Sequence, residues 1–395
     1  MPDAITLALV GDVYIDRPDP RSALRHVRPV LDDADYRFAN LESIYTDAPQ
    51  LAPSALLPAY VGTANAAAML DRPFDVVSLA HNHTLDAGHE AMLQTRQWLE
   101  DHGVRTCGAG ADIVQARTPA RVTVAGRTVA CLAYASMMPV GYEARHNWPG
   151  IAPMRARNVY EGTPNHWIPG EQPRVRTEPL PEDVDALVAD IRSAREHADV
   201  VIASFHWGDW TRKFFVSDHE QRTARLAIDA GADIVVGHHH HALRGVDWYR
   251  GRPIFYGLGH LVFDAPGAAE RARHLGLWRG DPDSYGALVV REGSPDSFPF
   301  HPDMRLTAIA WCRVSDGGID AGFIPCVIDA DNNPRAYEPT SPQGREVIAY
   351  LEEATRAAGS TVTFALAPDI RLGNVTSVRL VPNTRAEGSD RRITN

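Results

Sequence analysis

The chain has 395 residues, 44% of them hydrophobic, and its formal net charge is −11 at pH 7. This composition is typical of a globular protein with one large domain or two ordinary ones, and the negative charge argues against nucleic acid and anionic membranes as partners. Lys213 is the only lysine, so a pyridoxal phosphate (PLP) mechanism would have to use that one residue.

The first ten residues lack the basic leader of a signal peptide, and their apolar run ends at Asp12. That run is too short to cross a membrane, and no later stretch reaches about eighteen apolar residues. We therefore expect a cytoplasmic protein with no membrane partner. The four cysteines are widely spaced, which is typical of reduced core thiols rather than of a disulfide framework.

Three predicted strands in the first part of the chain each lead into a polar residue. They are residues 5–10 before Asp12, residues 36–39 before Glu42, and residues 74–80 before Asn82. Helices are predicted between them at 20–31 and near 65–70. Because ligands bind at the carboxyl edge of an open α/β sheet, these side chains are candidates for one site.

The middle of the chain repeats this arrangement with histidines. After a helix at 90–102 and a hairpin around 125–126, strands are predicted at 200–205 before His206 and at 234–236 before the four histidines 238–241. A helix at 183–197 precedes the first of these strands. Ser217 and Glu220 form a capping-box signal for the helix between the two. Clustered imidazoles at a strand end indicate a transition-metal site, although a surface histidine patch is the alternative.

Alternating strands and helices throughout predict an α/β sandwich. After short strands at 253–256 and 261–263 come a hairpin at 306–328, a helix at 344–357 and a weakly patterned tail. We expect a single domain over residues 1–365 with irregular insertions at about 137–181 and 265–304, followed by a C-terminal extension at 366–395. An irregular insertion rich in aromatics favours a substrate-binding loop.

His83 is the candidate for proton transfer. It follows Asn82, whose amide oxygen suits a metal, and it precedes Asp86 by three residues. Asp86 would accept the second imidazole N–H and fix its tautomer, or cap the helix that starts near Glu90, and the two roles are compatible.

Taken together, these motifs closely resemble the calcineurin-like metallophosphoesterase superfamily, in its CapA-like branch named for poly-γ-glutamate capsule biosynthesis. The matching segments are residues 11–12, 40–42, 80–88, 206–208, 237–241 and 256–264. The resemblance implies a four-layer α/β sandwich that holds a divalent metal. Its implied ligands are Asp12, Glu42, Asn82, His206, His239 and His241, with His238 and His240 as contenders because four consecutive histidines blur the register.

Three departures set this chain apart from the pattern of the superfamily. Tyr14 replaces the histidine of the first motif, Glu42 stands where many members have aspartate, and His260 replaces an asparagine. This ligand set suits one metal better than two, and its oxygen-rich half favours a hard ion such as Mn²⁺, Mg²⁺ or Ca²⁺, with Zn²⁺ also open.

A branch of the same family that the chain resembles better contains the epimerases of lasso-peptide biosynthesis, a class of ribosomal peptide (RiPP). The resemblance implies a metal-dependent isomerase that inverts the Cα of a precursor's C-terminal residue, without PLP or a nucleotide. The acid and base would be His83 with Asp86 on one side, and His260, oriented by Asp12 or Asp264, on the other. The alternatives are a metal-dependent hydrolase of phosphoester or peptide bonds and a non-enzymatic scaffold.

Aromatic side chains are the predicted contacts for a peptide substrate. Trp207 and Trp210 lie beside the metal motif, and Arg212 is the candidate partner of the terminal carboxylate. Tryptophans in the irregular segments complete this set: Trp148, Trp167 and Trp278. Their alternative role is ordinary packing against the domain.

Overall fold

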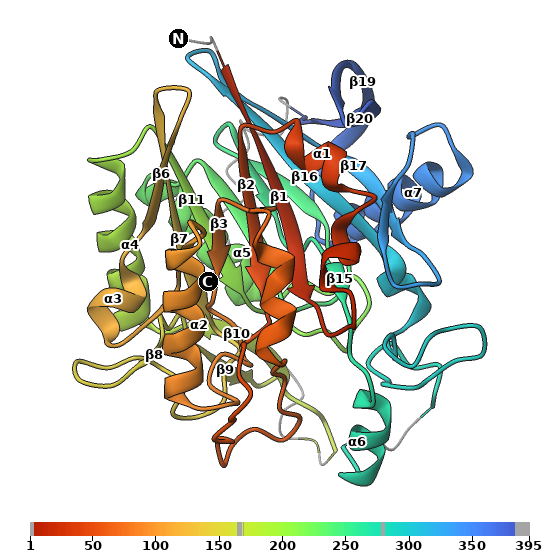
Figure 1. The fold of residues 1–395 in the computed structure, drawn as a ribbon. Helices are drawn as coiled ribbons and strands as arrows, with labels where there is room; N and C mark the ends of the chain where they lie inside the picture. The colour runs from red at the N-terminus through yellow and green to blue at the C-terminus, as the bar shows by residue number, and fades with distance from the viewer. Residues whose placement is uncertain (1–3, 164–167, 169, 278–280, 384–395) are drawn as a thin grey trace.

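The computed structural model describes residues 4–163, 168, 170–277 and 281–383. Two large sheets lie face to face at its centre (Figure 1). The strands of the larger one are β1 (Ala4–Tyr14), β2 (Tyr36–Leu41), β3 (Val76–Ser78), β4 (Arg105–Cys107), β15 (His260–Phe263), β16 (Leu306–Ser315), β17 (Gly318–Ile328), β18 (Pro334–Ala336), β19 (Thr363–Leu372) and β20 (Val375–Val381). Their order is β19-β20-β17-β16-β1-β2-β3-β4, with β15 paired to β1 and β18 to β17.

The second sheet has six strands. They are β6 (Ala120–Val124), β7 (Arg127–Ala135), β11 (Val200–His206), β12 (Ile234–His238), β13 (Val246–Tyr249) and β14 (Arg252–Phe255). Their order is β13-β14-β12-β11-β7-β6. Two small pairs lie outside both sheets: β5 (Ala109–Gly110) with β8 (Gly150–Ile151), and β9 (Ala156–Glu161) with β10 (Arg174–Pro179).

The helical segments cover the outer faces of the sheets. They are η1 (Pro20–Leu24), α1 (Arg28–Asp32), η2 (Thr63–Met69), α2 (His89–Asp101), α3 (Ile113–Arg117), α4 (Pro181–Arg195), α5 (Asp218–Ala230), α6 (Ala268–His274), η3 (Pro302–Arg305) and α7 (Pro342–Ala357). Helices α4 and α5 pack on β11 and β12, while α2 packs on β4 and α7 on β16 and β17. The predicted four-layer α/β sandwich is therefore confirmed.

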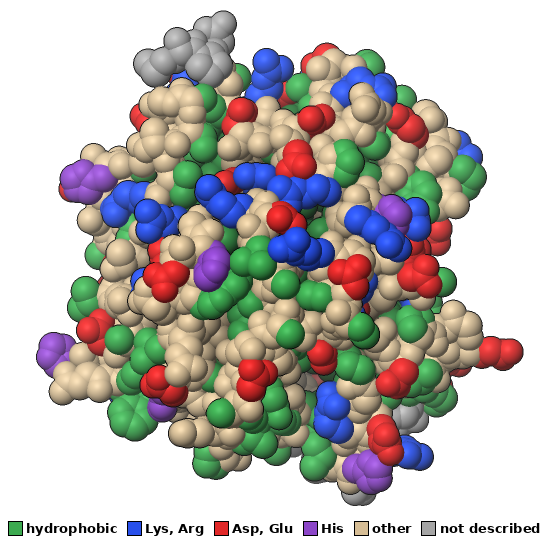
Figure 2. Space-filling view, viewed as in Figure 1, with side chains coloured by type: hydrophobic (Ala, Val, Ile, Leu, Met, Phe, Trp, Pro, Cys, Tyr) green, Lys and Arg blue, Asp and Glu red, His purple; other side chains and the backbone are tan. Residues whose placement is uncertain are grey.

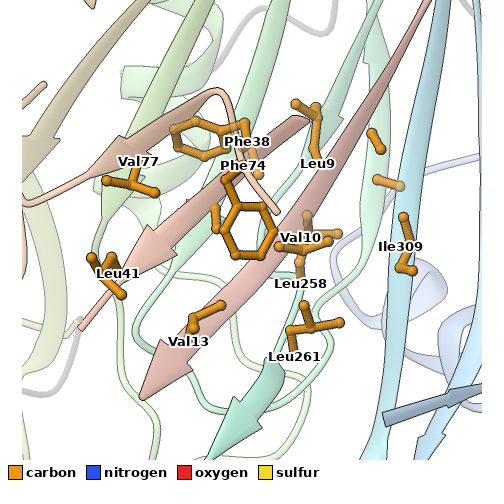
Figure 3. Close-up of a cluster of buried hydrophobic side chains, with 14 of the residues drawn as sticks. Leu9, Val10, Val13, Phe38, Leu41, Phe74, Val77, Leu258, Leu261 and Ile309 are labelled. Atoms are coloured by element: carbon orange, nitrogen blue, oxygen red, sulfur yellow. The ribbon is translucent and has the colours of Figure 1, made fainter. Parts of the chain in front are cut away.

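The alternation of side chains along a strand builds these layers. In β11, Val200 and Ile202 face the core between the two sheets, whereas Val201, Ala203 and Phe205 face the core beneath α4 and α5. Strands of the ten-stranded sheet and the segments that lead into them contribute large apolar side chains to the first core (Figure 3): Leu9, Val10, Val13, Phe38, Leu41, Phe74, Val77, Leu258, Leu261 and Ile309.

Two predicted features differ from the structure. The single helix predicted at 20–31 is two short segments, η1 and α1, because Pro29 has no N–H to donate to the turn before it and stands in the first turn of a new helix. The tail is a hairpin of β19 and β20 that pairs with β17, so the predicted extension at 366–395 begins inside β19. The insertion at 137–181 contains β8, β9 and β10, and the one at 265–304 contains α6.

Parallel pairing brings the polar strand ends together. β1 pairs in parallel with β2 and β15, β2 with β3, and β11 with β12. The carboxyl ends of these strands therefore lie at one edge of the sandwich. Within the part of the chain that the structure describes, no helix has the length and apolar character needed to span a bilayer.

Candidate metal centre

The six predicted ligands form one connected cluster. His206 Nε2 lies 2.7 Å from Asn82 Oδ1 and 3.9 Å from Glu42 Oε1. His239 Nδ1 lies 3.1 Å from His206 Nε2. The Asn40 amide nitrogen links Asp12 to this group, at 2.9 Å from Asp12 Oδ1 and 3.4 Å from His206 Nδ1, and His241 Nδ1 lies 3.4 Å from Asp12 Oδ2. Residues from five separate segments of the chain are thus in contact, as the strand-end pattern predicts.

Several buried polar atoms of this cluster have no hydrogen-bond partner among the described residues. They are Asp12 Oδ2, both carboxylate oxygens of Glu42, His239 Nε2 and His241 Nδ1. An unpartnered buried polar atom costs free energy, and a buried carboxylate costs more unless a cation compensates it. Among the described residues, Asp12, His241 and His260 place ligand atoms within 4.8 Å of one another, and a carboxylate oxygen with imidazole nitrogens fits a divalent metal ion.

Electrostatics at the cluster keep the imidazoles of His206 and His239 neutral. Burial and the neighbouring histidines lower the pKa of both His206 and His239 well below its usual value. Burial and the charge of Asp12 raise the pKa of Glu42 well above its ordinary range. Burial opposes ionisation of Asp12 as well, but the neighbouring side chains of His241, His238 and Asn40 hold its pKa below the usual value. Neutral imidazoles are the form that binds a metal.

The backbone of the histidine run turns sharply after β12. His239 and His241 adopt φ angles of 87° and 55°, in the left-handed region that non-glycine residues rarely occupy. Both side chains line a cavity, whereas His238 and His240 do not. His238 lies beneath them, with its Nδ1 3.6 Å from Asp12 Oδ1. The turn therefore directs alternate histidines toward the cavity.

His240 has a separate partner that removes it from the candidate ligands. Its Nε2 lies 2.8 Å from Glu220 Oε1 on α5, and both side chains are fully buried. Glu220 also accepts a hydrogen bond from the backbone N–H of Ser217, as the predicted capping box requires. Gly208 leaves room for this pair, since a Cβ there would meet His240 Nε2 at 2.1 Å.

His83 and Asp86 form the predicted pair next to the cluster. His83 Nδ1 lies 2.6 Å from Asp86 Oδ2, and His83 Nε2 lies 3.0 Å from the amide nitrogen of Asn82. The Tyr142 hydroxyl donates to Asp86 Oδ1 at 2.7 Å. Asp86 does not cap α2, because Gly88 occupies the N-cap position and no side chain caps there. The structure thus supports the orienting role of Asp86.

The cluster and the pair open onto a cavity of about 630 Å³. His83, Asp86, His239 and His241 line its inner wall, and Trp210 lies beside them. The remaining walls are mostly apolar: Leu56, Leu57, Pro58, Phe263, Leu277, Leu288 and Phe300. Figure 2 shows hydrophobic side chains toward the lower centre of this face and charged side chains at the lower right, where Figure 1 places α6.

His260 is near the cluster but not at the cavity wall. Its ring lies 4.6 Å from that of His241, and metal-ligating atoms of Asp12, His241 and His260 lie within 4.8 Å of one another. Asp264 does not orient it, because the Arg17 guanidinium holds both Asp264 oxygens at 2.6 and 2.7 Å. Of the two predicted orienting groups, only Asp12 is therefore close to His260.

Two of the three predicted substrate contacts lie elsewhere. Trp207 is 1% exposed, stacks on Phe205 at 4.6 Å and donates its indole N–H to the Tyr256 carbonyl. The Arg212 guanidinium lies 3.5 Å from the centre of the Phe215 ring and does not line the cavity. Of the predicted loop aromatics, Trp148 is half exposed beside His89 outside the cavity lining, and the other two, Trp167 and Trp278, lie outside the described residues.

Arg271 and Tyr14 line the cavity although they were not assigned from the sequence. Tyr14 replaces the superfamily's histidine, and its hydroxyl donates to the Tyr60 carbonyl at 3.0 Å. Its position two residues after Asp12 could have identified it as a cavity residue from the sequence. Arg271 lies in the short helix α6, within a segment whose composition predicts no regular structure, so no pattern distinguished it from the other arginines.

Comparisons with known proteins identify relatives of this chain. The sequence is 27% identical over 272 residues to the PGA biosynthesis protein CapA of Bacillus subtilis (strain 168), covering 66% of this chain and 64% of that protein. It is 33% identical over 198 residues to a probable polyglutamine synthesis accessory protein of Mycobacterium tuberculosis, covering 49% of this chain and 46% of that protein. The chain thus spans less than two thirds of the length of these relatives.

Among solved structures, the calcineurin-like phosphoesterase YfkN from Bacillus subtilis superposes with a TM-score of 0.33 at 12% identity, over 89% of this chain and 97% of that one. Superposition at this level supports no inference about activity. The family profile is decisive, because it matches residues 6–265 and so includes every residue of the cluster. The chain belongs to the family described as bacterial capsule synthesis protein PGA_cap.

Proposed function

We propose that the protein is a metal-dependent peptide epimerase, which inverts the Cα of the C-terminal residue of a ribosomal (lasso) precursor peptide. The observation that carries the proposal is the His83–Asp86 pair at the wall of the same cavity as His239 and His241. Epimerisation needs an acid–base group at Cα and positive charge for the developing enolate, and these two groups of residues are placed to provide them.

The lining of the cavity favours a peptide over a phosphoester. Its walls are largely apolar, and Asp16 and Asp86 are among its charged residues, with Arg271 as the one Arg or Lys among the described lining residues. Beyond a bound metal, the described residues of this lining offer a single cationic side chain for phosphate oxygens. An uncharged peptide segment with a single carboxylate at its end matches this lining better.

Asp86 prepares His83 for proton abstraction. It lies at hydrogen-bond distance from His83 Nδ1, so the Nδ1 proton stays in place and the lone pair is on Nε2. In the free protein that nitrogen faces the Asn82 amide, from which it accepts a hydrogen bond. We assign to Nε2 the removal of the Cα proton.

A divalent cation held by Asp12, Glu42, Asn82, His206, His239 and His241 would supply the positive charge that stabilises an enolate oxygen. We assign delivery of a proton to the opposite face of Cα to His260, which lies within 4.8 Å of the ligand atoms of Asp12 and His241. His260 is packed directly behind His241, which lines the cavity.

The proposal also places the protein in the cytoplasm with a precursor peptide as its partner, because ribosomal precursors are made there. The names of the relatives refer to PGA biosynthesis and polyglutamine synthesis. A hydrolase that cleaves phosphoester or amide bonds, including those of a polyglutamate chain, is therefore the alternative function.

The test is incubation of the metal-loaded protein with free-acid peptides in D₂O, followed by mass spectrometry and chiral amino-acid analysis. We expect one deuterium at the last Cα, a mixture of L and D residues, and no shorter fragments. Substitution of His83 by Gln should abolish the exchange, whereas substitution of His102, an exposed residue at the end of α2, should leave it unchanged.

Release of peptide fragments or phosphate without Cα deuterium would replace the epimerase by the hydrolase. A variant H83Q that exchanges as fast as the wild type would remove His83 from the mechanism, even if the wild-type protein proves to be an epimerase.

A further inference from the structure

We infer that Arg271 binds the free C-terminal carboxylate of the substrate and that the aromatic wall of the cavity receives a large apolar side chain at the last residue. This inference rests on the proposed function and names its substrate class. The class is a linear peptide that ends in an unmodified carboxylate on a bulky apolar residue.

The guanidinium of Arg271 is available for such a contact. The guanidinium donates a hydrogen bond to the Pro266 carbonyl at 3.0 Å. Among the residues that the structure describes, no carboxylate lies within ion-pair distance of it. An arginine has five N–H donors in a planar fork that matches a carboxylate. Most of its donors are therefore free to face the cavity that it lines.

Other charged groups near the cavity are already engaged. Arg17 is bound to Asp264 and Asn333, so it has no free pair of N–H donors for a further carboxylate. Asp86 is occupied by His83 and Tyr142. Asp16 lines the cavity with Arg271, and its carboxylate accepts a long hydrogen bond from the Asn65 amide at 3.4 Å. Arg271 is thus the group that can oppose the charge of an incoming carboxylate.

The wall next to the metal cluster is aromatic. The Trp210 ring lies 5.9 Å from that of His241, and the Phe263 and Phe300 rings lie 5.0 and 5.2 Å from it. All three side chains line the cavity. A terminal residue with its Cα near His83 would bury an apolar side chain against these rings, and a Phe or Leu side chain would gain more than Ala from this burial.

Isothermal titration with three hexapeptides tests the inference without turnover. The peptides end in Phe as the free acid, in Phe as the amide, and in Ala as the free acid. Charge-assisted hydrogen bonds contribute roughly 1.5–3 kcal/mol, so we expect the free acid to bind roughly 10- to 100-fold more tightly than the amide. Replacing Phe by Ala should weaken binding by roughly 10-fold or more.

Variants at one helix separate the carboxylate contact from general charge. Arg271→Gln should bind the free acid and the amide equally, and Arg271→Lys should keep part of the preference. Arg273→Gln is the matched control, because Arg273 is exposed on the same helix α6 and does not line the cavity. Asp16→Asn should tighten binding of the free acid, since it removes a like charge from the cavity.

Several results would overturn the inference: equal affinity of the wild type for the acid and the amide, absence of binding by either, or a preference for the acid that survives in Arg271→Gln. The proposed function fails in a different way. If the free acid binds through Arg271 but acquires no deuterium at Cα in D₂O, the carboxylate site stands and the epimerase does not.

Discussion

The two sheets contribute different chemistry to the candidate metal centre. The ten-stranded sheet supplies the oxygen donors, with Asp12 in β1, Glu42 after β2 and Asn82 after β3. The six-stranded sheet supplies imidazole, with His206 at the end of β11 and the histidine run at the end of β12. Neither sheet carries a complete ligand set, so the centre exists only where the two edges meet.

This division has consequences for metal choice. Oxygen donors suit Mg²⁺, Ca²⁺ and Mn²⁺, whereas imidazole suits Zn²⁺ and later transition metals. The balance between the two sheets should therefore set the selectivity of the centre, and substitutions on either side should shift it in opposite directions.

The largest effect is expected from removing a donor on one side. His206→Asn takes an imidazole from the centre and should lower Zn²⁺ affinity by more than about 100-fold, with a smaller loss for Mg²⁺. Glu42→Gln removes a carboxylate from the other side and should weaken Mg²⁺ more than Zn²⁺. Competition titrations with metal analysis measure both. Equal losses for both ions in both variants would show that the two sheets do not differ in this way.

The next effect concerns catalysis without metal loss. Asp86→Asn should reduce Cα deuterium exchange by roughly 100-fold or more, because the amide no longer fixes the His83 tautomer. Metal content should stay at the wild-type value, since Asp86 belongs to the pair and not to the cluster. Tyr142→Phe removes only one hydrogen bond to Asp86 and serves as the milder control. If Asp86→Asn lost metal as well as activity, the His83–Asp86 pair and the metal cluster would not be separate in function.

A third substitution tests whether Glu220 holds the histidine turn of the six-stranded sheet in place. Glu220→Ala leaves His240 Nε2 and the Ser217 N–H without their partner and should cost about 2–3 kcal/mol of unfolding free energy. Because the histidine turn loses its anchor on α5, metal affinity should also fall by about 10-fold. Asp229→Ala, an exposed change on the same helix, is the control. Unchanged metal affinity at reduced stability would limit Glu220 to a folding role.

The smallest effect is the response of the metal-free protein to pH. Burial lowers the pKa of His81 to about 3 and that of His238 to about 4. Between about pH 6.5 and those values the unfolded imidazoles bind protons that the folded ones do not, so stability falls as the pH falls through this window. Each such histidine changes the unfolding free energy by up to about 1.4 kcal/mol per pH unit.

Denaturation in the presence of a chelator at pH 7, 6 and 5 measures this slope. His81→Leu should flatten it, whereas His102→Gln, at an exposed site, should not. An unchanged slope in His81→Leu would mean that His81 titrates alike in the folded and unfolded states.

The convergence of the metal-centre side chains could be predicted because the sequence shows where strands end. An apolar run that stops at a polar residue marks the carboxyl edge of a sheet, and Asp12, Glu42, Asn82 and His206 all follow this rule. It also fixed the four layers, since alternation between strands and helices is strong in this chain. The tail hairpin β19–β20 was missed because β19 is largely exposed and neither strand shows a regular alternation of buried and exposed residues.

Errors at the cavity have physical causes. Trp207 was assigned to the substrate because it follows His206, yet adjacent residues of an extended strand point to opposite sides, and Trp207 continues the Phe205 face. This alternation along the strand could have been read from the sequence. The position of Arg271 could not be read from it, because that position depends on how an irregular segment folds back over the cavity. The register of the histidines depended on Glu220, a distant residue that a local pattern does not reveal.

The left-handed backbone at His239 and His241 has a consequence for the evolution of this centre. Glycine or asparagine would adopt these φ angles at a lower cost, and each histidine gives up about 1–2 kcal/mol to hold them. Substituting glycine at either position should therefore relax the backbone while deleting a nitrogen donor. At the tetrahistidine turn, the substitution that would raise the thermal stability of the fold would also weaken metal binding.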